Sequence, residues 1–233
     1  MAANGRTQSR RRAQLSRDSI LEAALTLTAE GEQVTFRALG GALGADPTAV
    51  YRHFRDKDEL VRAAYDRIME KARAEVDESS SWREQIRQLA ILSWENSEQH
   101  PHIAVDAPIL TTGGPGELGC IDLMLGCLRA AGLGDRDVVR FYGVIGSYIL
   151  SISANISAQK LAAADQGTDI NTAWLYDVSG IDATRYPNVA ASRYELGELS
   201  NDDVYLTGID VLLDAVEAAA QAEAPTVARA RQR

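Results

Sequence analysis

The stretch GADPTAVYRHFRDKDEL, residues 44–60, concentrates side chains that can bind an anion, in a chain whose formal net charge is -9. Tyr51, Arg52, His53 and Arg55 follow one another closely, behind an Asp-Pro pair that is typical of a helix start. Arginine and tyrosine side chains commonly contact the phosphates of a nucleic acid. The same residues would also suit an ordinary solvated surface, so the choice depends on the elements that carry them.

Apolar spacing predicts helices on both sides of this stretch. A helical repeat runs over residues 16–30 with Ser16 as its N-cap, and FRALGGALG forms a second, short helix capped by Thr35. Asp56 with Glu59 resembles a capping box at the start of a longer helix over residues 57–76. These helices would hold the cationic stretch in place.

The stretch itself predicts a short third helix. Asp46 caps it and Pro47 occupies its first position, where a missing N–H costs nothing. With Val50 and Phe54 facing inward, the outer surface consists of Pro47, Thr48, Tyr51, Arg52 and Arg55. Two helices joined by Gly-Ala-Asp predict a helix-turn-helix, whose second helix fits a DNA major groove. The alternative is a three-helix subdomain with a solvated face.

The charge of the chain is unevenly distributed. Residues 1–75 carry 13 Lys and Arg against 11 Asp and Glu, whereas residues 76–233 carry 11 against 22. A basic N-terminal part therefore precedes an acidic body, as in proteins with a nucleic-acid-binding module. Residues 1–15 predict a flexible arm that either stays solvated or enters a flanking minor groove through Arg6, Arg10, Arg11 and Arg12.

Helical periodicity continues beyond residue 76 and no β pattern is found, so we predict an all-α fold. Further helices are predicted over residues 82–99, 117–131, 135–159, 189–196 and 202–222. HPHIAVDAPILTT, which starts at His100, predicts a short broken helix, and residues 160–183, with Trp174 and Tyr176, predict a mobile loop. The tail over residues 223–233 is expected to fray.

The residues present do not favour an enzyme. No nucleophile elbow or pair of catalytic carboxylates occurs, and the glycine-rich TTGGPGELG lacks the Gly-Lys-Ser/Thr ending of a phosphate loop. His100 and His102 stand near Asp106 without further ligands. We therefore expect no metal, no cofactor and no catalytic residues.

The sequence also predicts where the protein resides. No apolar run of about 18 residues occurs, and the charged N-terminus lacks the apolar core of a secretory signal. Cys120 and Cys127 lie two helical turns apart, too far for an easy disulfide, and are expected to be small core residues. We therefore expect a cytoplasmic protein without a membrane segment.

The run LSRDSILEAALTLTAEGEQVTFRALGGALGADPTAVYRHFRDKDELVRAAYDRI resembles the N-terminal module of the TetR family of bacterial transcriptional regulators. The specific parts are the opening helix, the T-x-R-x-L-x-x-x-L-G second helix, the Val-Tyr-x-His-Phe third helix and the Lys-Asp-Glu-Leu start of the fourth. A weaker resemblance, to the last two helices of the tetracycline-repressor-like subgroup, covers YPNVAASRYELGELSNDDVYLTGIDVLLDAVEA. Residues 76–183 resemble the family only in their helical layout.

The resemblance implies a DNA-binding domain over residues 16–62, joined through a long helix to a ligand-binding and dimerisation domain over 63–222. It implies a homodimer that binds a palindromic double-stranded DNA operator and releases it when a small-molecule effector moves helix four. The family pairs two C-terminal helices per subunit, which here would be those near 135–159 and 202–222. Their broad apolar arcs agree with one side facing the core and the other side a partner.

The resemblance further implies DNA contacts at particular positions. Arg37 falls where tetracycline repressors read a guanine, and a salt bridge on its own helix is the alternative. Thr35 either donates to a phosphate or only caps its helix. Arg52 replaces an aromatic residue of the tetracycline repressors, so their operator sequence does not carry over. Residues that would face bases are Pro47, Thr48 and Ala49, and those that would contact phosphates are Tyr51, His53 and Lys57.

An effector pocket is implied among the helices of the body. We expect apolar walls with a few hydrogen-bonding groups, although plain core packing is the alternative for any one residue. The aromatic bias favours a flat or multi-ring, mostly apolar ligand. The expected ligand-binding residues are Trp94, His102, Asp106, Met124, Phe141, Tyr142, Tyr148 and Asn155.

These features predict a ligand-responsive transcriptional repressor with a small-molecule effector, an operator partner and no membrane partner. The alternative is an all-helical protein whose acidic body has an enzymatic or partner-binding role without specific DNA binding. Salt-sensitive, sequence-selective DNA affinity would distinguish them, because an enzyme does not need it.

Overall fold

The computed structural model describes residues 15–166 and 180–230, and these residues form an all-α fold, as predicted. The basic arm, Trp174, Tyr176 and residues 231–233 lie outside the described residues. The elements are α1 (Arg17–Ala29), α2 (Phe36–Leu43), α3 (Pro47–Val50), α4 (Lys57–Glu75), α5 (Trp82–Gln99), α6 (Pro101–Ala104), the 3-10 turn η1 (Ala107–Ile109), α7 (Pro115–Ala130), α8 (Asp135–Gln166), α9 (Pro187–Ala191), α10 (Arg193–Glu198) and α11 (Asn201–Ala230).

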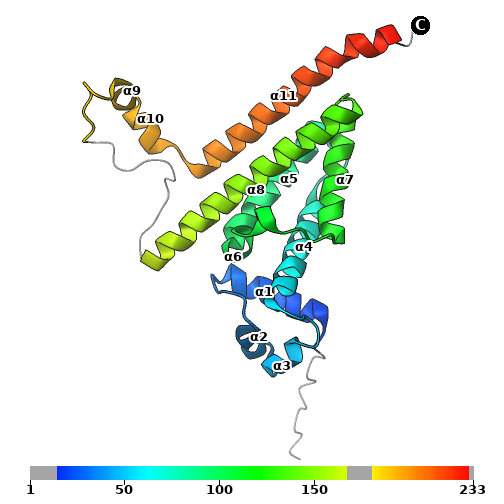
Figure 1. Ribbon diagram of the computed structural model, residues 1–233, viewed down its shortest axis with the longest axis vertical. Coiled ribbons are helices and arrows are strands. Elements are labelled where there is room, and N and C mark those ends of the chain that lie inside the picture. Colours follow the sequence, from blue (N-terminus) through cyan, green and yellow to red (C-terminus); the bar gives the residue numbers. More distant parts are fainter. Residues whose placement is uncertain (1–14, 167–179, 231–233) are drawn as a thin grey trace, which may run out of the picture.

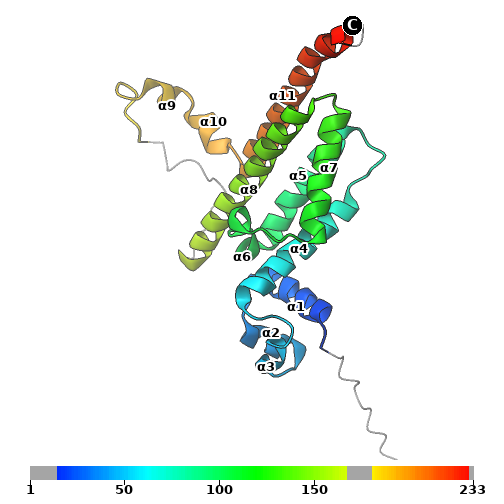
Figure 2. The ribbon, with the colours of Figure 1, turned by 45° about the vertical axis from the view of Figure 1, so that its right-hand side comes forward.

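Helix α4 connects a small N-terminal group of helices to a larger body (Figure 1). α1, α2 and α3 gather around the beginning of α4, whereas α5, α7, α8 and α11 form the body beyond it. α8 and α11 run side by side in both views, and α9 and α10 lie apart from the other helices (Figure 2). The DNA-binding module expected from the sequence is therefore a separate layer with α4 as its link.

Each part has its own hydrophobic core. The N-terminal core includes Ile20, Leu39, Val50, Phe54 and Leu60, all nearly or fully buried. The body core is larger and includes residues of α5, α7, α8 and α11. Ile103 of α6 packs into the N-terminal core although α6 follows the body helix α5. The two cores are therefore joined through α6 as well as through α4.

Local capping explains why the N-terminal helices begin where they do. The side chains of Ser16, Thr35 and Asp46 each accept a hydrogen bond from a backbone N–H in the first turn of their helix. Gly44 ends α2 in the left-handed region at φ 59°. A Cβ at Gly40 would stand 2.9 Å from the carbonyl oxygen of Ala45, so the tight turn between α2 and α3 needs a glycine there.

Several predicted elements differ in detail from those observed, among them α8, which continues to Gln166 past the end expected at residue 159. Asp56 caps α4, but the carboxylate of Glu59 accepts from the backbone N–H of Arg55 rather than from that of Asp56, so a true capping box does not form. The helix predicted over residues 189–196 is two short helices, separated at Ser192. α11 extends to Ala230, past the end expected at residue 222.

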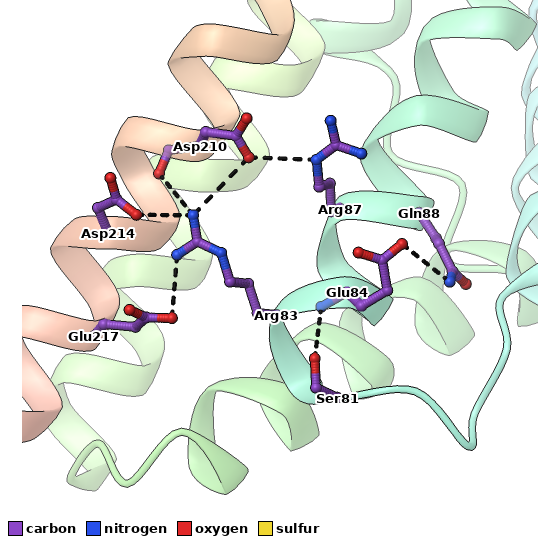
Figure 3. A network of polar contacts seen from close by, with 8 residues as sticks. All are labelled: Ser81, Arg83, Glu84, Arg87, Gln88, Asp210, Asp214 and Glu217. Carbon is purple, nitrogen blue, oxygen red and sulfur yellow. Dashed lines mark hydrogen bonds and ion pairs between the residues drawn. The ribbon is translucent and has the colours of Figure 1, made fainter.

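Helix α11 is held against the body by polar and close-packed contacts. Figure 3 shows Arg83 of α5 reaching acidic side chains of α11, with distances of 2.8 Å to Asp214 and 3.2 Å to Glu217. Gly208 lies against Tyr148 of α8, whose hydroxyl donates to the carbonyl oxygen of Val204 at 2.9 Å. A Cβ at Gly208 would overlap the Tyr148 ring, so the small residue is needed for this approach.

Helix α8 is long and apolar enough, by length and composition, to cross a membrane. Its mean hydropathy over the most apolar window is 1.2, and 33% of that window is buried. It contacts α5, α6, α7 and α11, which is the packing of a body helix. The part left uncovered includes Val139 and Val144, which are more than half exposed.

Candidate nucleic-acid interface and internal cavity

The nine residues expected to contact DNA lie at the beginning of α2, on α3, in the turn after α3 and at the first residue of α4. Seven are exposed, whereas Ala49 and His53 are half-buried. The ring of Tyr51 meets that of Phe36 edge to face, with 4.2 Å between the ring centroids, and this contact ties the end of α3 to α2. The exposed residues are Thr35, Arg37, Pro47, Thr48, Tyr51, Arg52 and Lys57.

Arg37 and Lys57 are available to an anionic partner, because neither makes an ion pair with a residue in the described part of the chain. The hydroxyl oxygen of Thr35 accepts from the N–H of Ala38 at 3.1 Å, so its own proton can still be donated. The Thr48 hydroxyl donates to Asp46 at 2.7 Å, which leaves its methyl group and its oxygen for a partner. That hydrogen bond holds the pKa of the Asp46 carboxyl below its ordinary value.

Arg17, which the sequence interpretation did not single out, fixes the turn between α3 and α4. Its Nη1 donates to the carbonyl oxygen of His53 at 2.8 Å and to Glu59 at 3.1 Å. Its guanidinium lies 4.1 Å from the centroid of the Phe54 ring. Hydrogen bonds from the backbone and side chain of Arg55, and then from Arg17, lower the pKa of Glu59 to about 2. Glu59 is therefore ionised, and it holds Arg17 and the backbone of Arg55 in place at the turn before α4.

Two adjoining cavities lie among α4, α5, α7 and α8. Their volumes are about 50 Å³ and about 110 Å³. Both are lined by Tyr65 and Met69 of α4, and the larger one also by Glu117 and Met124 of α7. The lining is mostly apolar with a few polar groups, which is the composition of a small-molecule site.

Of the eight residues expected to bind a ligand, Met124 and Tyr142 line the larger cavity. Neither cavity is lined by the other six, which are Trp94, His102, Asp106, Phe141, Tyr148 and Asn155. Trp94 stacks on Tyr205 with 4.5 Å between ring centroids, and Tyr148 bonds to α11. Trp94 and Tyr148 therefore pack their helices against α11.

The remaining four residues are also placed elsewhere. Nε2 of His102 lies 3.1 Å from the carbonyl oxygen of Gly31, beyond the end of α1. Phe141 is half-buried against the body core, and Asp106 and Asn155 are exposed. The sequence interpretation missed Tyr65 and Met69 of α4, which line both cavities. The apolar positions of a helix do not by themselves reveal which residues face a cavity.

His100 links the smaller cavity to the N-terminal module. It is 6% exposed, and its Nδ1 lies 2.8 Å from the hydroxyl oxygen of Thr28 in α1. Since the Thr28 hydroxyl donates to the carbonyl oxygen of Leu25 at 3.0 Å, its oxygen accepts from Nδ1–H of His100. Burial, with a smaller contribution from the charge of Lys71, lowers the pKa of His100 below its ordinary value of 6.5.

Acidification is expected to destabilise the fold through His100. Below about pH 6.5 the unfolded chain binds a proton that the folded chain resists, so the free energy of unfolding falls as the pH decreases through about 6.5. His100→Gln keeps a donor for Thr28 without a titrating ring and should flatten this dependence. Urea unfolding at several pH values would measure it. Equal flattening by His53→Gln would contradict the assignment to His100.

A polar junction joins α4 to the beginning of α7. The Asp66 carboxylate of α4 accepts from the backbone N–H groups of Glu117 at 3.0 Å and Gly116 at 3.3 Å, and from the Thr112 hydroxyl at 2.7 Å. Asp66 therefore caps a helix that is distant in sequence. A Cβ at Gly116 would overlap the carbonyl oxygen of Asp66, so the two helices touch backbone to backbone. Any movement of α4 relative to α7 has to break this junction.

Comparison with known proteins gives a consistent family assignment. Residues 20–64 match the family described as bacterial regulatory proteins, tetR family. An HTH-type transcriptional regulator of Saccharopolyspora erythraea is 30% identical over 150 residues, which is 63% of this chain and 64% of that protein. The HTH-type transcriptional repressor DrrR1 of Streptomyces coeruleorubidus is 26% identical over 216 residues, covering 87% of this chain and 77% of that protein.

The fold is similar as well. The crystal structure of a putative transcriptional regulator from Streptomyces coelicolor A3(2) superposes with a TM-score of 0.72 at 28% identity, over 88% of this chain and 98% of that chain. The matched residues cover most of α1, all of α2 and α3 and the first part of α4, and the structural likeness extends through the helical body. Residues 20–64 therefore form the N-terminal module of the tetR family of bacterial regulatory proteins, and the described helical body has the fold of that putative regulator.

Proposed function

We propose that this chain is a transcriptional repressor that binds a palindromic double-stranded DNA operator as a homodimer and releases it when a small molecule fills the cavity. The α2–α3 surface carries the proposal. There Arg37 and Lys57 are exposed and free of ion pairs with described residues, over a fully buried Val50. Cations held on a rigid module without internal partners suit contacts with a phosphate backbone and a base edge.

The nine residues proposed to contact DNA divide into two roles. Arg37 reads a base, because a guanidinium can bond a guanine at two atoms, and Pro47, Thr48 and Ala49 offer small apolar contacts to thymine methyl groups. A second group contacts phosphates, and these contacts fix the position of the protein on the DNA without reading the base sequence. This group consists of Thr35, Tyr51, Arg52, His53 and Lys57.

The homodimer is proposed to form through α8 and α11. These helices run side by side, and their uncovered residues include Val139, Val144 and Val211, each more than half exposed. A second copy would bury this surface in a four-helix arrangement. Such burial accounts for the apolar character of α8 without a membrane, and a cytoplasmic location follows from the DNA partner.

Coupling between cavity and DNA is proposed to run through α4. Tyr65 and Met69 of α4 line the cavity, and Leu60 of the same helix lies in the N-terminal core. The junction of Asp66 with α7 and the contact of His100 with Thr28 hold α4 and α1 in the observed position. A ligand that separates α4 from α7 would move the DNA-binding module and change the spacing of the two half-sites.

The test is binding of the full chain to its own upstream DNA and to random DNA, by fluorescence anisotropy over a salt series. We expect palindrome-selective binding with a steep negative dependence of log affinity on log salt. Weak binding that does not distinguish the two DNAs would overturn the proposal and favour a partner-binding or enzymatic body.

A further inference from the structure

The larger cavity contains a carboxylate with an unused oxygen. Glu117, in the first turn of α7, lines this cavity and is half-buried. Its Oε2 accepts from the backbone N–H of Thr112 at 2.8 Å and from that of Gly113 at 2.6 Å, and it lies 3.0 Å from the Thr112 hydroxyl that donates to Asp66. No hydrogen bond from the described residues reaches Oε1. The carboxylate is therefore held in place by one oxygen while the other remains available.

No cation balances this carboxylate within the cavity. Neither lysine nor arginine is among the described residues that line it. Arg73 is close enough to act on the neighbouring Cys120, but it pairs with Glu78 at 2.6 Å and does not line the cavity. Burial raises the pKa of Tyr142, and the negative charge of Glu117 raises it further. The cavity therefore has a negative field.

Two phenol groups and apolar walls complete the site. The hydroxyls of Tyr65 and Tyr142 make no hydrogen bond with other described residues, so both can accept from a ligand. Aromatic rings also attract cations through their faces. The walls are formed by Leu89, Leu110, Ile121, Met124, Ile149 and Leu150.

We propose that the effector is an amine, in which an apolar, ring-containing body fills the cavity and an ammonium group pairs with Oε1 of Glu117. The proposal rests on the cavity being the effector site of the proposed repressor. An ammonium would neutralise the half-buried carboxylate and donate to the tyrosine hydroxyls, whereas a ligand carboxylate would meet like charge. The proposal thus narrows the ligand class from apolar and aromatic to apolar and cationic.

The position of this site also explains how an amine would be sensed. The backbone N–H of Glu117 is one of the groups that Asp66 of α4 caps, at 3.0 Å. Oε2 of the same residue holds the Thr112–Gly113 segment that precedes α7. An ammonium that draws the Glu117 carboxylate toward the cavity would therefore act on two sets of contacts at the α4–α7 junction. These are the hydrogen bond from Glu117 to Asp66 and the hydrogen bonds from the Thr112–Gly113 segment to Glu117.

Single-ring probes suit the test, because the cavities of about 110 Å³ and about 50 Å³ together match the size of a cavity that admits benzene, about 150 Å³. Benzylamine, benzyl alcohol and benzoate share a ring and differ in charge at neutral pH. The chain has three methionines. Met69 and Met124 line the cavity, and Met1 lies outside the described residues. Methyl-labelled methionine in the full chain therefore reports occupancy by NMR titration.

We expect benzylamine to shift the Met69 and Met124 signals and to bind at least about tenfold more tightly than benzoate, with benzyl alcohol between them. Glu117→Gln should remove the preference for the amine. Asp122→Asn, an equal charge change on an exposed residue of the same helix outside the lining, should retain it.

Benzoate binding as tightly as benzylamine, an unchanged preference in Glu117→Gln, or no shift of either methionine with any probe would each overturn the proposal. The titration contains no DNA, so its result is independent of the salt series. A chain that binds its operator but shows no amine preference refutes only the ligand class. A chain with the preference but no selective DNA binding refutes only the repressor function.

Discussion

Gly116→Ala is expected to lower the free energy of unfolding by about 2–3 kcal/mol. The new methyl group would overlap the backbone carbonyl oxygen of Asp66, and no side-chain rotation can relieve an overlap with backbone. α4 and α7 would have to separate, which would stretch the hydrogen bonds from Gly116 and Glu117 to the Asp66 carboxylate. Since α4 is the link to the N-terminal module, operator affinity should also fall.

The matched control is Gly126→Ala, on the same helix. Gly126 is exposed, and a Cβ there would have no atom within 4 Å. Alanine is the better helix former, so this variant should gain about 0.5–1 kcal/mol. Urea unfolding of both variants would measure the difference. Equal stability of the two would show that α4 and α7 do not make the close backbone contact that the structure indicates.

Arg37→Ala is expected to weaken operator binding by about 1–3 kcal/mol and to relax selectivity at one base-pair position in each half-site. Lys57→Ala should instead weaken binding to all sequences alike, and should reduce the salt slope by about 1 for each copy of the residue. The physical reason is that a bidentate contact to a base edge distinguishes sequences, whereas a phosphate contact does not.

Anisotropy titrations with the operator, single-position operator variants and random DNA would separate these effects. Arg136→Ala removes the same charge from an exposed residue at the beginning of α8, in the body, and should leave both quantities unchanged. If Arg37→Ala and Lys57→Ala lowered affinity in the same way for every sequence, the division into base and phosphate contacts would be wrong.

The sequence alone determined the N-terminal module, because local rules specify it. Ser16, Thr35, Asp46 and Asp56 each cap the helix that they were expected to cap. A capping side chain bonds to an N–H only two or three residues away, so its effect can be read from a short window. The burial of Val50 and Phe54 follows in the same way from helical spacing, as does the all-α class.

The lining of the cavity was decided by the tertiary structure. Trp94 and Tyr148 have the residue types of a ligand site, yet their partners are Tyr205 and Val204 of α11, far along the chain. Tyr65 and Glu117, from α4 and α7, line the larger cavity together because Asp66 and Gly116 bring these helices into contact. A broad apolar arc can face a core, a cavity or a neighbouring helix. The rotation of each helix about its axis, set by contacts between residues distant in sequence, decides which of these it faces.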